Sequence, residues 1–570
     1  MKKVELVVRA EAIHTMAPVS GGAGGSVGGG VGGGADGAGG GTPVRALAAA
    51  GGKVVALSQD GDFAGWDTSG AKVVTAPPGG AVLPGLGDVH AHLHMAGHSD
   101  LYELFLDPDW SVEQLLEAVA GAAAAAPPGA WIAGGMWGIS RFRELASVCV
   151  RRRFDAAAGG HPLLLRDDTA HHRLVNDATL RIMGIDLADA RSLAPDVDTD
   201  PATGEPTGVV GEAASRRAEE TWEASRAAVP GEDEASMARA VELLNQTGVT
   251  LVQEAATGAQ MLRALRCLDD AGRLNAWVVT SVSINDKVFG FVPIGQPLVE
   301  QAAGFAGGRV FPTFAKIFLD GTPPTFTALM HDPYPPHPGH GAGYRGEATM
   351  SLEQLAGWMA VLAEHGLGVK VHCTGDGAVS LALDALELAR SRGVALPAHI
   401  AHAQMIQRAD YPRIAGLGAV IDICPLFWFP SAFQSGALAT LPDATREGIC
   451  MFRDQLDAGI KLAGGSDWPV SPNPNPWWGI HGLVTRTNPT GEVPGAYRPD
   501  QALTVREALS LYTTNVADAA GLGSRAGSLE VGKAADFIVV DRDPFKIDPL
   551  LLGATRTLET WVGARQVFAA

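Results

Sequence analysis

Residues 84–94 read PGLGDVHAHLH, a short apolar strand that runs into Asp88, His90 and His92. Side chains alternate between the two faces of a strand, so the imidazoles of His90 and His92 point the same way and could bind one metal ion. An isolated H-x-H pair is more often two polar residues of a loop. The stretch therefore predicts a metal site only if other strands bring further ligands to the same end of a sheet.

Three later strand ends carry residues of the same kind. His372 ends the apolar run in VKVHC, His402 ends the run in AHIAH, and Asp467 follows a strand and two glycines in LAGGSDW. A histidine at one strand end is usually a hydrogen-bonded structural residue. Such sites at the carboxyl ends of several strands converge on one point when the strands close into a barrel, so together they predict a single metal centre.

Apolar runs and helical stretches alternate along the middle of the chain. Such alternation predicts a parallel sheet with helices outside it, and the nine runs are close to the eight strands of a (β/α)₈ TIM barrel of the α/β class. The runs lie at 83–89, 162–166, 249–253, 276–281, 313–319, 368–372, 398–402, 419–424 and 460–464. Helices are predicted at 112–126, 234–247, 351–366, 376–392 and 444–458.

Both ends of the chain have β character. Strands are predicted at 4–9, 53–57, 536–541 and 556–568. We expect the early strands to pair with the late ones in a small β-sandwich domain, made of residues 1–82 and 524–570, beside a barrel of residues 83–523. Residues 21–41, GGAGGSVGGGVGGGADGAGGG, should form a flexible insertion because glycine loses much conformational entropy when it is ordered.

The overall composition argues against several classes of protein. The chain has 570 residues and a net charge of −19, which disfavours a phosphate-rich partner such as nucleic acid. Its five cysteines are scattered and suit a reducing compartment. No clean signal segment is present, and the alanine run 121–126 is too short to span a bilayer. We expect a cytoplasmic protein that acts on a small-molecule substrate without a membrane partner, and barrels of this size often associate into homo-oligomers.

The order of the motifs resembles that of the amidohydrolase superfamily. An H-x-H pair, two single histidines and a late aspartate follow one another, and the details are similar to the amidohydrolase-3 branch, which includes N-substituted formamide deformylases. PGLGDVHAHL, KIFLDG, VHCTGD, IAHAQ, GSDWPV and GSLEVGKAADFIVVDRDPF carry the resemblance, which covers nearly the whole chain. The chain departs from the branch at His399 and Ala401, where Arg and Glu are usual, and mildly at Cys373, Thr374 and Gly377.

The resemblance implies a ligand set and a metal. The implied metal ligands are His90, His92, Lys316, His372, His402 and Asp467. Imidazole and carboxylate ligands suit Zn²⁺, with one or two ions bound. Lys316 would ligate as a carbamate that bridges two metals, because an ammonium cannot bind a cation. The alternative is that Lys316 stays an amine and pairs with Asp320 or binds substrate.

The resemblance also implies a mechanism. A metal-activated water attacks a carbonyl carbon, Asp467 acts as general base, and His171 in AHHRLVN helps to stabilise the oxyanion. The predicted function is hydrolysis of a non-peptide C–N bond in an amide, formamide, carbamate or cyclic amide. The alternatives are a decarboxylase, hydratase or esterase on the same barrel, or a non-catalytic binding protein.

A further set of residues is predicted to line the substrate pocket. Its members are Trp137, Arg141, Trp428, Trp468 and His94. For the tryptophans the competing interpretation is ordinary packing in the core.

Overall fold

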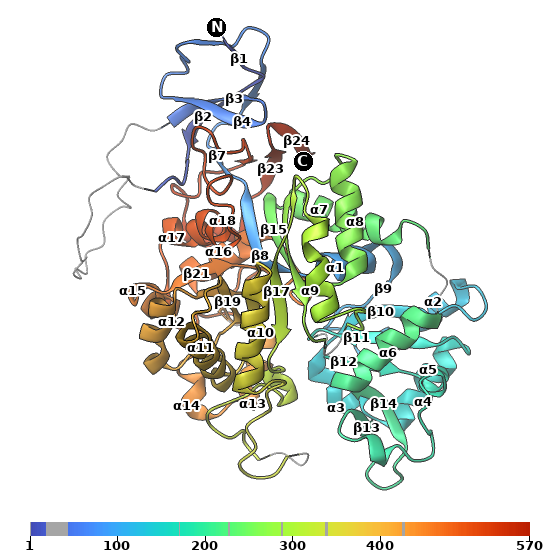
Figure 1. Cartoon of the computed structure of the whole chain (residues 1–570). Helices are drawn as coiled ribbons and strands as arrows, with labels where there is room; N and C mark the ends of the chain where they lie inside the picture. The colour runs from blue at the N-terminus through green and yellow to red at the C-terminus, as the bar shows by residue number, and fades with distance from the viewer. Residues whose placement is uncertain are drawn as a thin grey trace.

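The computed structural model describes residues 2–18, 44–169, 171–225, 229–286, 289–336, 340–424 and 428–570. The predicted glycine-rich insertion, 21–41, lies outside these residues. Figure 1 shows a central barrel, a sheet at the top that contains strands from both chain ends, and an α/β unit beside the barrel.

Eight parallel strands form the predicted barrel. They run in the order β8 (Leu86–Ala91), β15 (Val249–Thr257), β16 (Trp277–Ser283), β17 (Val310–Phe318), β18 (Gly368–Cys373), β19 (Ala398–His402), β20 (Val420–Ile423) and β21 (Lys461–Gly464). Just beyond β21 the chain meets β8 again. Ala91 and Trp468 form a parallel bridge, and the Asp467 amide donates to the His90 carbonyl at 2.7 Å. This contact nearly closes the barrel and puts the carboxyl ends of its first and last strands side by side.

Helices surround the barrel (Figure 1). They are α1 (Leu93–Tyr102), α7 (Glu232–Gln246), α8 (Ala259–Asp270), α9 (Gln296–Ala302), α10 (Leu352–Glu364), α11 (Asp376–Ser391), α12 (Tyr411–Leu417), α13 (Ala432–Thr440), α14 (Asp443–Arg446), α15 (Phe452–Asp457), α16 (Pro476–Thr485), α17 (Val505–Leu511) and α18 (Thr514–Ala519). Every residue of β15 and of β18 is buried, because helices cover the outer face and side chains fill the interior. The barrel strands therefore appear in the sequence as nearly continuous apolar runs.

The predicted helix 444–458 is divided in the structure. The gap between α14 and α15 contains Cys450, whose φ is +55°, and Ile449 bridges Met405 there. A left-handed residue interrupts a right-handed helix, so one continuous helix cannot form.

The run 162–166 does not belong to the barrel. It is β11 (Leu163–Asp167) of a separate six-stranded sheet inserted between α1 and α7. The other strands are β9 (Leu104–Phe105), β10 (Ile132–Trp137), β12 (His172–Val175), β13 (Val197–Thr199) and β14 (Pro206–Gly211), and the helices are α2 (Val112–Ala125), α3 (Phe142–Leu145), α4 (Val148–Ala158), α5 (Asp177–Ile182) and α6 (Glu212–Ser225). An apolar run shows that a strand is buried but not in which sheet, which explains the surplus run in the prediction.

The two chain ends share one sheet, as predicted. It contains β2 (Leu6–Ile13), β3 (Val44–Ala50), β4 (Lys53–Ser58), β6 (Lys72–Thr75), β7 (Ala81–Pro84), β22 (Phe537–Val540), β23 (Thr557–Val562) and β24 (Arg565–Ala569), while β1 (Lys2–Lys3) and β5 (Trp66–Asp67) pair beside it. β22 lies between β7 and β23. The predicted strand 83–89 is divided between this sheet and the barrel at Gly85, where a Cβ would lie 2.1 Å from Thr250 Oγ1. Only glycine fits this passage.

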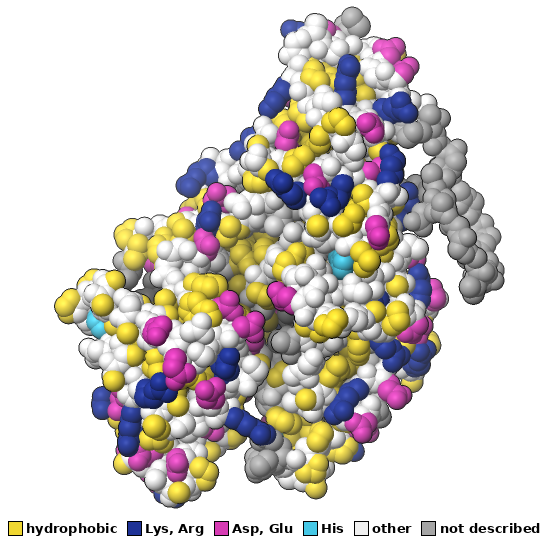
Figure 2. Space-filling view, turned by 180° about the vertical axis from the view of Figure 1, so that it is seen from behind, with side chains coloured by type: hydrophobic (Ala, Val, Ile, Leu, Met, Phe, Trp, Pro, Cys, Tyr) yellow, Lys and Arg dark blue, Asp and Glu magenta, His cyan; other side chains and the backbone are white. Residues whose placement is uncertain are grey.

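The surface is mixed in charge. On the face in Figure 2, Lys and Arg side chains are interspersed with Asp and Glu side chains. Among the described residues, no helix combines the length and apolar character needed to cross a membrane.

We expect His399 on β19 to make stability depend on pH. Its side chain is buried, its Nε2–H donates to the Ala519 carbonyl at 3.1 Å, and burial, followed by the charge of Lys370, lowers its pKa to about 3. In the unfolded chain His399 has its ordinary pKa of about 6.5, so the unfolded chain binds a proton more readily than the folded protein does. The stability of the fold therefore falls as pH drops below about 6.5. Between pH 7 and pH 5 the loss from this group should be about 2 kcal/mol.

The test compares urea unfolding at pH 7 and pH 5 in the wild type and in His399→Asn, which keeps a donor for Ala519. The variant should lose less stability on acidification. An equal loss in both proteins would show that His399 does not titrate as argued.

Candidate metal centre

Asp467 joins the two histidines of the H-x-H pair. Its Oδ1 lies 3.5 Å from His90 Nε2 and 3.4 Å from His92 Nε2, and its Oδ2 lies 3.8 Å from His402 Nδ1. Donor atoms of His90, His92 and Asp467 all lie within 4.8 Å of one another, and all three residues are buried. The approach of β21 to β8 needs Gly465, where a Cβ would meet His90 Cβ at 2.9 Å.

The remaining predicted ligands lie around the same point. The ring centroid of His402 is 4.6 Å from that of His90 and 4.6 Å from that of His372. Lys316 Nζ on β17 lies 3.3 Å from His90 Nε2. The structure therefore brings together every residue of the predicted ligand set. His171, from the insertion, lies next to it, with its ring centroid 6.3 Å from that of His372.

Two of these side chains sit on strained backbone. His402 has a φ of +69° and Asp467 a φ of +59°. Residues other than glycine rarely adopt the left-handed region, and such strain is concentrated at functional sites. Both strained residues contribute donor atoms to the candidate metal cluster.

Burial sets the charge state of the cluster. It lowers the pKa of His90, His92, His372 and His402, so these imidazoles are neutral near pH 7. Burial, followed by the charge of Lys370, also lowers the pKa of Lys316 to about 8. A neutral imidazole is the form that binds a metal. The donor set fits a divalent ion.

Carboxylates lie next to the Nδ1 atoms of three of the histidines, and the sequence did not reveal their role. Asp422 Oδ2 accepts from His90 Nδ1 at 2.8 Å, and Asp320 Oδ1 accepts from His372 Nδ1 at 3.0 Å. Glu254 Oε1 lies 4.0 Å from His92 Nδ1. Asp320 also accepts the backbone amides of Thr374 and Gly375, so it orients His372 rather than pairing with Lys316.

Lys370 supports the carboxylate behind His90. Its ammonium donates to Asp422 Oδ2 and to the Val89 carbonyl, and its side chain is fully buried. In the sequence, Lys370 lies in KVH and Asp422 lies in IDI, so each of two apolar strands contains one charged residue. A buried charge is retained only when it is paired, and the partner could not be identified from the sequence.

We expect Asp422→Asn to weaken Zn²⁺ binding about 10–100-fold, because the partner on Nδ1 fixes the tautomer that presents His90 Nε2 to the metal. The measurement is competition with a chromogenic chelator. Asp536→Asn, which alters a buried carboxylate hydrogen-bonded to Trp277 and Gly563, is the control. Equal affinity in Asp422→Asn and the wild type would contradict the orienting role.

Two tryptophans predicted to line the pocket are core residues instead. Trp137 is fully buried in the insertion, and its indole N–H donates to the Leu165 carbonyl at 2.9 Å. Trp428 is also fully buried and packs against Phe452 at 5.3 Å between ring centroids. Neither tryptophan belongs to the lining of the cavity that adjoins the cluster.

The other predicted pocket residues differ in their surroundings. Arg141 is partly exposed, and its guanidinium donates to the Asp109 carbonyl within the insertion. Trp468 directly follows Asp467 and is nearly buried. His94 Nε2 contacts Asp233 Oδ1 at 2.7 Å.

A small, partly open cavity adjoins the cluster. It lies between the barrel and the insertion, and its lining includes His92, His94, Trp222, Phe289 and Phe291. The cavity therefore reaches the cluster at His92, with aromatic side chains next to it.

Residues 78–568 match the model of the amidohydrolase family. The chain belongs to this family. The matched region includes the whole barrel, the insertion and the β7, β22 and β23 strands of the terminal sheet, so membership does not rest on a single motif. This amidohydrolase is accordingly a hydrolase.

Curated relatives cover nearly the full length of the amidohydrolase. It is 28% identical over 549 residues to the N-substituted formamide deformylase of Arthrobacter pascens, which covers 91% of this chain and 94% of that protein. It is 26% identical to a putative amidohydrolase of Bacillus subtilis, over 86% of this chain and 89% of the relative.

A solved structure has the same architecture. An uncharacterized metal-dependent hydrolase from Pyrococcus horikoshii OT3 matches with a TM-score of 0.68 and 25% sequence identity, over 89% of this chain and 95% of the other.

Proposed function

We propose that this amidohydrolase cleaves the C–N bond of an amide, formamide, carbamate or cyclic amide, with a metal ion at the strand ends and Asp467 as general base. The observation that carries the proposal is the place of Asp467, whose Oδ1 lies within 3.5 Å of Nε2 of both histidines of the H-x-H pair. A carboxylate beside two neutral imidazoles can share a metal with them and still accept a proton from water.

The donor set supports Zn²⁺ as the metal. His90, His92, His372, His402 and Asp467 would hold it, and nitrogen and carboxylate donors are those that zinc prefers. When bound, the ion supplies Lewis acidity and lowers the pKa of water to about 7.

The protein's own groups would move the proton and hold the substrate. Asp467 accepts a proton as the water oxygen bonds to the carbonyl carbon, and it delivers that proton to the nitrogen as the C–N bond breaks. His171 reaches the cluster from the insertion, with its Nδ1 3.4 Å from Glu212 Oε1. From this place it would donate a hydrogen bond to the carbonyl oxygen of the substrate.

Lys316 is proposed to act as a carbamate. Among the described residues, no carboxylate lies within ion-pair distance of its Nζ, although the side chain is fully buried. Mass spectrometry of protein purified without added metal tests the modification together with the metal content. About two metals per chain with a carbon dioxide adduct on Lys316 supports a bridged pair. About one metal and a free lysine would leave Lys316 as an amine that contacts substrate.

The lining of the cavity indicates how a substrate would be oriented at the metal. Its aromatic side chains, Phe289, Phe291 and Trp222, would contact an apolar substituent on the nitrogen while the carbonyl group faces His92. The name of the Arthrobacter relative makes N-substituted formamides the first compounds to examine.

The decisive experiment is a substrate panel with identified products. N-substituted formamides, carbamates, cyclic amides and matched esters are incubated with the protein before and after chelation. Release of amine and carboxylate, lost on chelation and restored by Zn²⁺, supports the proposal. Cleavage of the esters alone, or loss of carbon dioxide from a carboxylate substrate, would refute C–N hydrolysis.

A further inference from the structure

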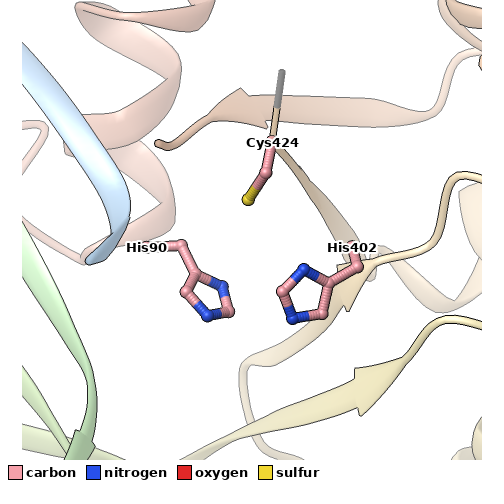
Figure 3. Close-up of side chains that lie close together, drawn as sticks. All are labelled: His90, His402 and Cys424. Atoms are coloured by element: carbon pink, nitrogen blue, oxygen red, sulfur yellow. The ribbon is translucent and has the colours of Figure 1, made fainter. Parts of the chain in front are cut away.

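A buried thiol lies on one side of the metal cluster and has no part in the proposed reaction. Cys424 directly follows β20, and its side chain is fully buried. Its Sγ and one nitrogen each of His90 and His402 all lie within 4.8 Å of one another. Figure 3 shows the three side chains around one space, each from a different barrel strand or its end.

The direction of the thiol follows from strand geometry. Asp422 and Cys424 are two residues apart, so their side chains leave the chain on the same side. Asp422 Oδ2 already contacts His90 Nδ1 at 2.8 Å, and Cys424 Sγ lies 3.8 Å from Asp422 Oδ1. Cys424 therefore faces the same histidine one step nearer the barrel mouth.

His402 supplies an independent sign of a ligand. It is only 6% exposed, and in the part of the chain that the structure describes its imidazole has no hydrogen-bond partner. Its contact with the Asp467 carboxylate spans 3.8 Å. Buried polar groups are nearly always satisfied, and a metal ion would satisfy this imidazole.

We propose that Cys424 ligates, through its thiolate, the metal ion that His90 and His402 bind. The inference rests on the proposed function only in using the same metal centre. The S–H bond breaks as the sulfur–metal bond forms, and the proton leaves to solvent, so a dication and a thiol become a thiolate complex and a proton. The charge of the metal, with the nearby Lys370, offsets the thiolate beside Asp422.

A thiolate ligand changes the metal preference of the site. Sulfur is a soft donor that favours Zn²⁺ and Co²⁺ over Mg²⁺ and Mn²⁺. A cluster of imidazole and carboxylate alone would discriminate less between these ions.

The test replaces the native metal by Co²⁺, whose spectrum reports its ligands. Full-length protein is stripped by chelation, loaded with Co²⁺ and recorded from the near ultraviolet to the visible. We expect visible bands from bound Co²⁺ and a near-ultraviolet sulfur-to-cobalt charge-transfer band. In Cys424→Ala the charge-transfer band should disappear. Zn²⁺ affinity should fall by at least ~10-fold, which is the lower cost of losing a group that only hydrogen-bonds to a metal ligand.

Cys373→Ala is the matched control. Cys373 is equally buried and lies at the end of the neighbouring strand β18, but its side chain faces the opposite way from His372 and packs in the apolar core. Its variant should keep the charge-transfer band.

Visible bands without a charge-transfer band in the wild type would overturn the role of Cys424 and leave the proposed hydrolase intact. Loss of the band in Cys373→Ala but not in Cys424→Ala would also overturn it. Failure to bind Co²⁺ or Zn²⁺ at all would overturn both proposals.

Discussion

Asp467→Asn is expected to fold normally and to lose catalytic activity about 10²–10⁴-fold in kcat, the range that general acid–base catalysis contributes. Asparagine has the same shape as aspartate and is, like it, tolerated at a positive φ, which Asp467 adopts at +59°. The amide cannot accept the proton of water, so the loss should appear in kcat rather than in substrate affinity. Steady-state kinetics on the substrate found in the panel measures it.

Metal content must be determined on the same Asp467→Asn sample, because the carboxylate also lies beside His90 and His92. Variant protein brought to wild-type metal content with excess Zn²⁺ should remain inactive. Full turnover in the Zn²⁺-loaded variant would contradict the general-base role and leave Asp467 as a ligand only.

His90→Ala is expected to abolish stoichiometric metal binding. His90 lies close to three of the other groups of the centre. Asp467 lies 3.5 Å from its Nε2, Lys316 lies 3.3 Å from the same atom, and Asp422 holds its Nδ1. Its removal should reduce Zn²⁺ affinity by more than ~100-fold, which is the upper cost of losing a group that only hydrogen-bonds to a metal ligand. Metal analysis after gel filtration measures the effect.

Stability must be separated from metal binding in this variant, since His90 is fully buried and alanine leaves a cavity. His90→Asn, which keeps polar bulk, should lose metal as well. His399→Asn removes an equally buried strand histidine whose nitrogen contacts the Ala519 carbonyl, and it should bind metal like the wild type. Normal metal content in both His90 variants would show that the ion is not held at β8.

The strand ends of the barrel were predictable because each carries its own local pattern. An apolar run followed by His90, His372, His402 or Asp467 can be recognised without knowing where the run lies in space, and parallel strands place such ends on one side. The structure brings these side chains together as predicted.

The supporting residues were not predictable by the same means. Lys370 and Asp422 lie on different strands, and only their contact identifies the pair that positions His90. Likewise, Trp137 and Trp428 resemble pocket residues in the sequence, but burial in two separate cores decides otherwise.

The sequence by itself determined the barrel, the pairing of the chain ends and the polar residues that meet at the barrel's strand ends, because hydrophobic periodicity and strand-terminal polar residues are local features. Only the tertiary structure decided that run 162–166 belongs to an insertion, that Asp320 hydrogen-bonds to His372, and that Cys424 lies beside His90 and His402. The physical reason is that these facts are contacts between strands distant in sequence, and such contacts exist only when the barrel closes.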